Sequence, residues 1–268
     1  MNDRPPYEPQ PVRRHAAGEW SDRTLNLVWE RPVALVYNGI SHAVMMATPT
    51  DLEDFAVGFS LTEGIIEDMR ELTDVEAVET EKGVEVRMTI FERRLAGLKE
   101  RRRNMTGRTG CGLCGTESLD VAIRPLPALM DTNSRFTPRQ ILDLLPALDQ
   151  TQELRRATRA SHGAAWVDAH GTVLAREDVG RHNALDKVIG AGSRLRWNPE
   201  RSLAVVSSRC SVEMVQKVVA ARIPLLAAVA SPTALAAQLA HDWGLTLVTS
   251  LRPDSFDVIT HPQRIEGA

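Results

Sequence analysis

The sequence predicts an α/β protein, α+β overall, in which a smaller β-rich N-terminal domain precedes a larger sheet domain. Three observations predict this fold class. The dipeptide Asn38-Gly39 stands between two apolar runs, as in a β-hairpin with a tight turn. Residues 50–64 combine a capping-box spacing with apolar residues at helical intervals. From residue 203 onward, short apolar runs alternate with helix-like segments, which is the pattern of a parallel sheet with helical crossovers.

We place the N-terminal domain at residues 21–124, ending in a loop rich in glycine and threonine. Apolar patterns predict strands over 32–37, 42–47 and 84–91, a helix from 52 towards a stop at Gly64, and a helix over 92–103. Thr50 and Glu53 have the spacing of a capping box. Residues 1–20 contain prolines and arginines but no apolar run, so we expect a solvated, flexible tail.

The C-terminal α/β domain is predicted at residues 125–268, after a linker that contains Pro125 and Pro127. Thr137-Pro138-Arg139-Gln140 provides an N-cap, a first-turn proline and a capping-box partner, and Pro146 should kink or end the helix that follows. Two strands should flank a turn at 168–171. The remaining expected elements are strands over 203–206, 223–230 and 245–251 and helices over 212–222 and 233–243.

Composition and charge exclude several classes of protein. The 32 basic and 35 acidic residues give a net charge of -3, so nonspecific nucleic-acid binding is not expected. No stretch approaches the roughly 18 apolar residues of a membrane span. Three cysteines without a secretory apolar run do not form a disulfide framework and indicate a reducing compartment. We therefore expect a cytoplasmic protein without a membrane span.

The paired cysteines Cys111 and Cys114 lie in the loop Gly110-Cys111-Gly112-Leu113-Cys114-Gly115 and allow four interpretations. A structural zinc site needs four ligands, and only His162, His182 or Cys210 could complete one from a distance. A dithiol oxidoreductase would place the motif at a helix start after a strand, which the upstream residues do not indicate. Inert loop thiols are disfavoured because exposed cysteine pairs are a liability. Sulfur carriage as a persulfide fits glycine-flanked, accessible thiols.

A ligand pocket is predicted at the carboxyl ends of the C-terminal strands, where parallel sheets bind ligands. Three loops lie there, at 207–211, 231–233 and 251–255; each contains hydroxyl groups and two contain an arginine. Together they indicate a pocket for a phosphate and a base. The alternative is that the serines act only as helix N-caps.

The run from Arg176 to Lys187 crowds charged and polar residues around a strand-to-helix turn at Gly180. Arg181 and His182 could bind phosphate or the edge of a pterin, and Asp178 could orient a neighbour or accept a hydrogen bond from a base. The structural alternative is an ion pair between Asp178 and Arg181 across the turn.

At these residues the chain resembles the FdhD family, the sulfur carriers required for active formate dehydrogenase. The resemblance rests on Leu52 to Phe59 with Thr62 to Ile66, on the Cys111 to Cys114 loop, on Arg176 to Gly190 and on Glu213 to Lys217. It implies that Cys111 carries a persulfide received from a cysteine desulfurase, with Cys114 assisting. It also implies a homodimer that serves the formate dehydrogenase apoenzyme.

The resemblance further implies that the protein binds molybdenum bis(molybdopterin guanine dinucleotide), whose guanine nucleotide ends are GDP-like. We expect no residues that bind a structural metal. We expect the cofactor-binding residues to be Ser250, Leu251, Arg252, Pro253, Asp254, Ser255, Ser207, Arg209, Asp178, Arg181 and His182. Two segments depart from the family pattern: Ser208 and Cys210 stand where the family has Gly and Ala, and Arg159-Ala160 replaces a glycine pair.

The family also implies a cytidine-deaminase-like sheet domain, which raises deaminase chemistry as a rival. That reaction needs a Glu two residues after a ligand His and a Pro-Cys-x-x-Cys pair downstream. Ala164 occupies the position of that Glu after His162, and the cysteine pair lies upstream, so deaminase catalysis is excluded. The remaining alternative is a non-catalytic chaperone of the molybdenum cofactor or the apoenzyme, with zinc-ligating cysteines.

Overall fold

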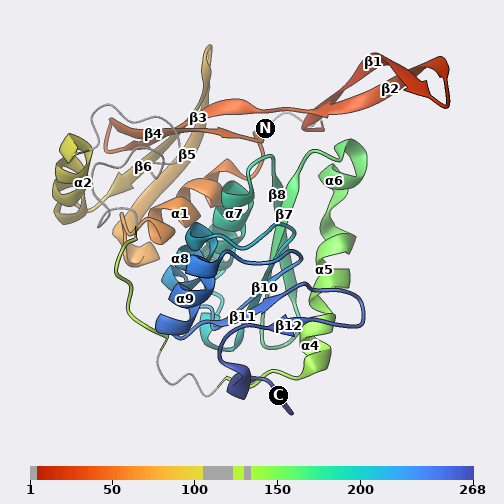
Figure 1. Cartoon of the computed structure of the whole chain (residues 1–268). Coiled ribbons are helices and arrows are strands. Elements are labelled where there is room, and N and C mark those ends of the chain that lie inside the picture. The colour runs from red at the N-terminus through yellow and green to blue at the C-terminus, as the bar shows by residue number, and fades with distance from the viewer. Residues whose placement is uncertain (1–4, 105–122, 130–133) are drawn as a thin grey trace.

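The computed structural model describes residues 5–104, 123–129 and 134–268. Figure 1 shows two sheet-containing parts that meet along helices α1 and α7, with a β-ribbon extending from one side. The buried apolar residues form three clusters, which draw on two separate stretches of the sequence. One cluster draws on residues between Val33 and Leu98, and two others lie on the two faces of the large sheet, with all their buried members from Leu129 onward.

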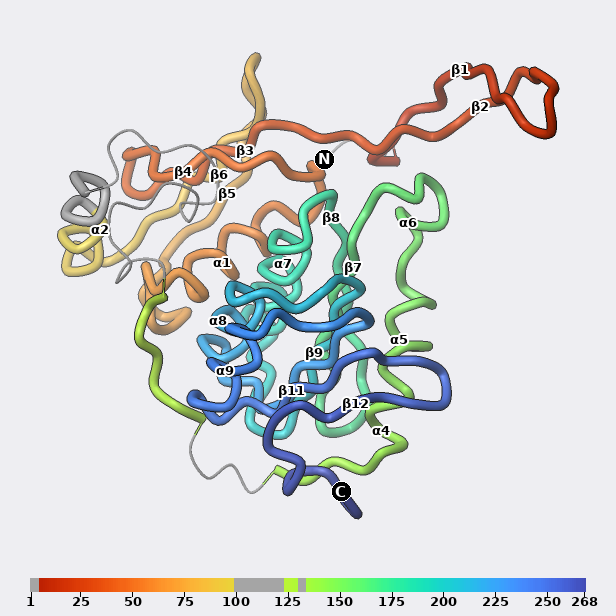
Figure 2. Tube along the Cα trace, in the orientation of Figure 1, coloured from red at the N-terminus to blue at the C-terminus, as the bar shows by residue number. Residues whose placement is uncertain are grey.

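The ribbon consists of β1 (Tyr7–Ala16) and β2 (Glu19–Val28), which pair as antiparallel strands along their whole length. The expectation of a flexible tail over residues 1–20 is therefore wrong for residues 7–20. In Figure 2 the ribbon projects away from the body, and most of its residues are exposed, Trp20 by 62%. Its described contacts with the body include a hydrogen bond from the Asn26 amide to the Ala157 carbonyl at 3.3 Å.

The N-terminal sheet has the strand order β4-β3-β6-β5. Its strands are β3 (Arg31–Tyr37), β4 (Ile40–Ala47), β5 (Leu72–Thr80) and β6 (Gly83–Ile90). The predicted Asn38-Gly39 hairpin is confirmed, with φ of 47° and 79° as such a turn requires. The Asn38 amide also exchanges two hydrogen bonds with the backbone of Ile90, which ties the turn to β6.

Helix α1 (Leu52–Thr62) covers one face of this sheet, while α2 (Glu92–Asn104) adds Leu95 and Leu98 to the same core. Helix α1 ends as predicted, because Gly64 has a φ of 63° just after the C-cap residue. The predicted capping box at its start is wrong. Asp51 is the N-cap residue, in the left-handed region, and forms no side-chain cap. A 3₁₀ turn, Met69–Glu71, leads into β5.

The C-terminal sheet has the strand order β12-β11-β10-β9-β7-β8. Its strands are β7 (His162–Val167), β8 (Val173–Asp178), β9 (Leu203–Val206), β10 (Leu225–Ala228), β11 (Thr246–Thr249) and β12 (Asp257–Val258). Strands β9, β10 and β11 are parallel, and β7 runs antiparallel to both of its neighbours. The predicted alternation of strands and helices after residue 203 is thus confirmed.

Helices cover both faces of this sheet (Figure 1). One face carries α7 (Arg181–Arg194), α8 (Val212–Ala220) and α9 (Ala234–Asp242), and the other carries α4 (Pro138–Leu142) and α5 (Leu144–Thr151), followed by α6 (Glu153–Thr158). The Thr137 capping box is confirmed. The break before Pro146 falls at Asp143, because a proline ring clashes with the carbonyl four residues earlier.

The two parts meet where α1 crosses α7, and glycines permit the crossing. A Cβ atom at Gly58 would lie 1.8 Å from the Asp186 carbonyl oxygen, and one at Gly190 would lie 1.9 Å from the Asp54 carbonyl oxygen. Both distances are far below van der Waals contact, so any side chain there would push the helices apart. Gly58 and Gly190, which lie in two different segments that resemble the FdhD family, therefore allow the close packing of α1 against α7.

Candidate functional site

The three predicted strand-end loops lie side by side at the carboxyl edge of the C-terminal sheet. The Val229 amide donates to the Val206 carbonyl at 3.2 Å, and the Leu251 amide donates to the Ala228 carbonyl at 3.3 Å. The Thr233 amide donates to the Cys210 carbonyl at 3.1 Å. These bonds connect the ends of β9, β10 and β11 in order, which confirms that the loops are neighbours.

The strand-to-helix turn after β8 joins the same edge. His162 at the start of β7 pairs with Asp178 at the end of β8, because these strands are antiparallel. The next residue, Gly163, exchanges two hydrogen bonds with Ser207: its amide donates to the Ser207 hydroxyl at 3.0 Å, and its carbonyl accepts from the Ser207 amide at 2.9 Å. The turn that carries Arg181 therefore lies beside the loop after β9.

Asp178 is a structural anchor in this fold and not an open ligand group. Its side chain is 0% exposed and forms a 2.7 Å ion pair with Lys187, which is also 0% exposed. The carboxylate also accepts from the Thr48 amide at 3.0 Å, the Gly180 amide at 2.8 Å and the Asn183 side chain at 3.0 Å. The Asp178 carboxylate is thus occupied by protein groups, and its contact with a cofactor stays a prediction. The alternative ion pair with Arg181 does not form among the described residues.

Arg181 and His182 open the first turn of α7 and remain half-buried. Within the described residues, no hydrogen-bond partner reaches the buried Nε of Arg181 or Nε2 of His182, and no carboxylate pairs with the Arg181 guanidinium. Burial, and after it the positive charges of Arg181 and Lys217, lower the pKa of His182 to about 4. At neutral pH His182 is therefore uncharged.

The segment from Ser250 to Ser255 divides between the core and the surface. Ser250 has a φ of 52°, Leu251 is fully buried, and Arg252, Pro253, Asp254 and Ser255 are exposed. The Arg252 amide donates to the Ser255 carbonyl at 2.8 Å, and its guanidinium donates to the Val229 carbonyl at 2.9 Å. The backbone therefore holds the Arg252 side chain at the edge, where Arg209 is exposed as well, whereas Leu251 has only backbone atoms to offer a ligand.

Of the three cysteines, Cys111 and Cys114 lie outside the described residues, so their assignment stays a prediction. Cys210 is fully buried in the core beneath the edge, and burial raises its pKa to about 12. A thiol in this state is not a nucleophile. Among the described residues there is no group of three or more His, Cys, Asp or Glu side chains that could hold a metal ion.

Sequence reasoning missed a buried ionic network around Lys217. Its ammonium group donates to the Thr62 hydroxyl at 3.0 Å, to Glu63 at 2.9 Å and to Asp186 at 2.9 Å. Thr62 in turn donates to Asp186 at 2.7 Å. Burial raises the pKa of Asp186 to about 6, while Lys217 opposes that shift. The network joins α1, α7 and α8, so several family-like motif residues hold the two parts together.

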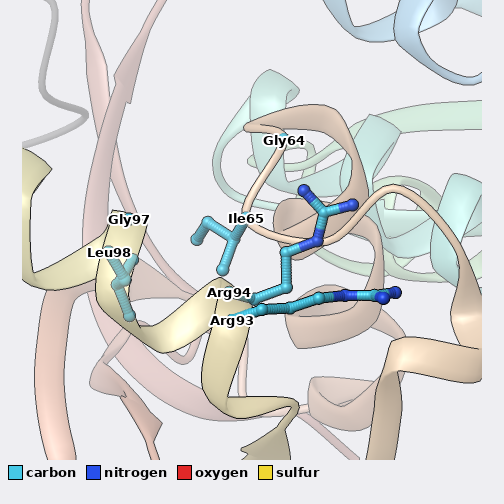
Figure 3. A pocket seen from close by; sticks show the side chains of 6 residues that line it. All are labelled: Gly64, Ile65, Arg93, Arg94, Gly97 and Leu98. Carbon is cyan, nitrogen blue, oxygen red and sulfur yellow. The ribbon is translucent and has the colours of Figure 1, made fainter.

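Figure 3 shows a small pocket between the end of α1 and helix α2. It is lined by Gly64, Ile65, Arg93, Arg94, Gly97 and Leu98. Its arginines are already neutralised, because Arg94 pairs with Glu67 at 2.7 Å and with Glu71 at 2.8 Å, and Arg93 pairs with Glu71 at 2.6 Å. The pocket thus offers little attraction for an anion, in contrast to the sheet edge.

No helix in the described parts of the chain is both long and apolar enough to span a membrane. The two-part architecture defines the class: an α/β protein with an attached β-rich part. Comparison with known proteins identifies the family. The FdhD/NarQ family model matches residues 28–266, and the chain therefore belongs to the FdhD/NarQ family.

Curated relatives cover almost the whole chain. Sulfur carrier protein FdhD of Xanthomonas euvesicatoria is 48% identical over 257 residues, which span 95% of this chain and 91% of the relative. The protein of the same name from Variovorax paradoxus is 48% identical over 258 residues, 96% of this chain and 92% of that one.

A solved structure from Desulfotalea psychrophila, described as a formate dehydrogenase accessory protein, aligns with a TM-score of 0.76. It covers 97% of this chain and 100% of its own, at 24% identity, and so shows a common fold. The mixed α/β class is thereby confirmed, whereas the likeness to cytidine deaminases stays a prediction.

Proposed function

We propose that this cytoplasmic protein carries sulfur: it accepts persulfide sulfur from a cysteine desulfurase on Cys111 and passes it to the molybdenum bis(guanine dinucleotide) cofactor of formate dehydrogenase. The observation that carries the proposal is membership of the FdhD/NarQ family together with relatives, 48% identical, that are named sulfur carriers. The Cys111-Gly112-Leu113-Cys114 motif supplies thiols for that chemistry. We expect the active form to be a homodimer that contacts the formate dehydrogenase apoenzyme.

The sulfur-transfer step is a displacement at sulfur. The Cys111 thiolate attacks the outer sulfur of the donor persulfide, a new S–S bond forms, and the donor cysteine leaves as a thiolate. No net oxidation occurs. Attack of Cys114 on the Cys111 sulfur then breaks that bond and releases hydrosulfide for the cofactor. The two thiols supply the two electrons and end as a disulfide, which a dithiol reductant restores.

The carboxyl edge of the C-terminal sheet is the place where we propose that the cofactor binds. Three adjacent loops present hydroxyl groups there, and the backbone carbonyl of Val229 holds the Arg252 guanidinium at that edge. Arginine is suited to bidentate contacts with phosphate. Cys210 cannot substitute for the loop thiols, because it is buried and its pKa is raised to about 12.

Mass spectrometry after incubation with a desulfurase and cysteine tests the sulfur step. We expect Cys111 to gain the mass of one sulfur atom, reversibly with DTT, in the parent protein and in Cys210→Ala as the matched control. Cys111→Ala should acquire no persulfide and should fail to activate formate dehydrogenase. Activation by Cys111→Ala without any adduct would contradict the proposal. Stoichiometric zinc that is lost in Cys114→Ala would instead indicate a zinc-bound chaperone.

Titration with GDP tests the ligand edge separately. Arg252→Ala removes a guanidinium group whose tethering bonds are to backbone carbonyls, so the fold should persist. We expect GDP to bind about tenfold more weakly to this variant, as loss of one charged hydrogen-bonding group implies. Unchanged GDP affinity would remove Arg252 from the site.

A further inference from the structure

The β1-β2 ribbon has one supported face and one exposed face. Asn26 donates to the Ala157 carbonyl of α6, and Val28 on the same face is half-buried. Leu25 and Leu27 alternate with these residues, so they lie on the opposite face, and each is 45% exposed. An isolated two-stranded ribbon is at best marginally stable in water. We therefore expect another surface to cover the leucines.

The exposed face of the ribbon is mainly apolar towards its base and carries no net charge. The cross-strand register places Val12 on it together with Leu25 and Leu27. Its charged residues balance in sign: Glu8, Arg14, Glu19 and Arg23. A nucleic acid or a strongly acidic partner thus meets no net charge to attract it. Burial of apolar area is the main attraction that this face offers.

The N-terminal sheet also has an open face. Met45 packs into the core on the side that α1 and α2 cover. Val44 and Met46 alternate with it and point to the other side, where they are 54% and 47% exposed. The register sets Val44 beside Ala34 and Met46 beside Pro32. An apolar strip therefore runs along β4 and β3, where a sheet face in water usually carries polar side chains.

The ribbon of one chain does not cover the open sheet face of the same chain. Figure 2 shows that the ribbon leads into β3 and projects beyond the sheet, away from the body. Each chain therefore has two exposed apolar surfaces, the leucine face of the ribbon and the strip along β4 and β3. A second copy of the chain offers both surfaces in return.

The areas of these surfaces favour a reciprocal contact. A ribbon of ten residues per strand is about 34 Å long and about 10 Å wide, so one face covers roughly 340 Å². Two ribbons packed on each other would bury roughly 700 Å² in total, which is less than the roughly 1,200 Å² of the smallest stable interfaces. Two ribbons that each lie on the partner's sheet would bury roughly 1,400 Å², which is within the stable range.

We propose that the β1-β2 ribbon is a dimerisation arm, whose leucine face packs on the open face of the N-terminal sheet of a second copy, over Val44 and Met46. The inference rests on the proposed function, in which the active form is a homodimer, and names the surface that forms it. Stacked sheets lie about 10 Å apart, so arm and sheet make a two-layer sandwich. Each copy gives one arm and receives one, which closes a two-fold dimer.

Light scattering after size-exclusion chromatography tests the arm in the full chain. The parent should have the mass of two 29.6 kDa chains. Leu25→Lys combined with Leu27→Lys buries two ammonium groups in the contact and should weaken dimerisation at least about a hundredfold. Both leucines are exposed in the single chain, so the circular dichroism spectrum should not change. The matched control, Leu195→Lys with Leu235→Lys, alters two exposed leucines elsewhere and should remain dimeric.

Cross-linking tests where the arm lies. In a background of Cys111→Ala and Cys114→Ala, one sample of Leu25→Cys is mixed with one of Val44→Cys and treated with a short bis-maleimide. We expect a cross-linked dimer in the mixture and none in either variant alone. Efficient cross-linking of Leu25→Cys to itself would show ribbons packed on each other and would overturn the reciprocal contact.

The oligomeric state and the sulfur chemistry are read separately. A monomeric parent, or a dimer that survives Leu25→Lys with Leu27→Lys, would refute the arm. A monomeric parent whose double variant no longer activates formate dehydrogenase would assign the ribbon to that enzyme in place of a second copy. The monomeric double variant should still gain persulfide sulfur on Cys111, since this step needs the thiols of one chain. Absence of the persulfide from a dimeric parent would refute sulfur carriage and leave the arm intact.

Discussion

The crossing of α1 and α7 gives the sharpest prediction about stability. In Gly190→Ala the added methyl group would lie 1.9 Å from the Asp54 carbonyl oxygen, so the helices must separate by about 1 Å. The obstacle is backbone and cannot rotate away. Separation would also strain the ion pairs of the Asp54 side chain with Arg176 at 2.7 Å and Arg194 at 2.6 Å.

We estimate the cost of Gly190→Ala at about 3 kcal/mol for overpacking against backbone. The better helix propensity of alanine returns about 1 kcal/mol. The net loss of about 2 kcal/mol should lower the melting temperature by roughly 4–8 °C for a chain of this length. Thermal unfolding followed by circular dichroism measures this.

The control is Gly97→Ala in α2, where an added Cβ meets no other atom of the described residues within 4 Å. There the same substitution gains helix propensity without a clash, so the melting temperature should stay level or rise by a few degrees. If Gly190→Ala melts at or above the parent temperature, the close contact between α1 and α7 is not what these glycines provide.

Three further predictions concern buried charge and the third cysteine. Lys187→Met leaves the Asp178 carboxylate buried without its cation and should cost about 3–5 kcal/mol in urea unfolding; a change under 1 kcal/mol would contradict the anchor role. The hydrogen bond from Arg94 lowers the pKa of Glu71 from 4.5 to about 2, so its stabilisation is present above 4.5 and lost as the pH falls towards 2. The stability gap between the parent and Glu71→Gln should close over that window, and a constant gap would refute this. Cys210 should resist iodoacetamide until the protein unfolds, because burial raises its pKa to about 12; rapid labelling in the folded state would disprove it.

Local sequence signals predicted those elements whose determinants lie close together in the chain. The Asn38-Gly39 turn, the Thr137 capping box and the strands and helices after residue 203 depend on neighbouring residues or on periodicity, and all were found. The β1-β2 ribbon was missed because residues 1–20 are rich in proline and hold no apolar run, which predicted a solvated tail; the prolines include Pro9 and Pro11. Two residues apart, they fall on alternate positions of a two-stranded ribbon, where an amide can face solvent and proline is tolerated.

The site shows the limit of local signals more clearly. The sequence placed the strand-end loops together correctly, since parallel strands end at a common edge. It did not predict the hydrogen bond between Thr48 and Asp178, which are 130 residues apart, and it missed the Lys217 network, in which Lys217 and Thr62 are 155 residues apart. Such pairings arise from packing of the two parts and leave no pattern in the intervening chain.

Transfer of labelled sulfur in a single turnover tests the central claim most directly. The protein is loaded from a desulfurase with sulfur-labelled cysteine, separated from the donor, and mixed with inactive formate dehydrogenase that contains its cofactor but has not received sulfur. We predict that label moves to the enzyme while formate oxidation appears, and that Cys111→Ala shows neither. Activation of the enzyme without label, or equal activation by Cys111→Ala, would contradict a sulfur-carrying role.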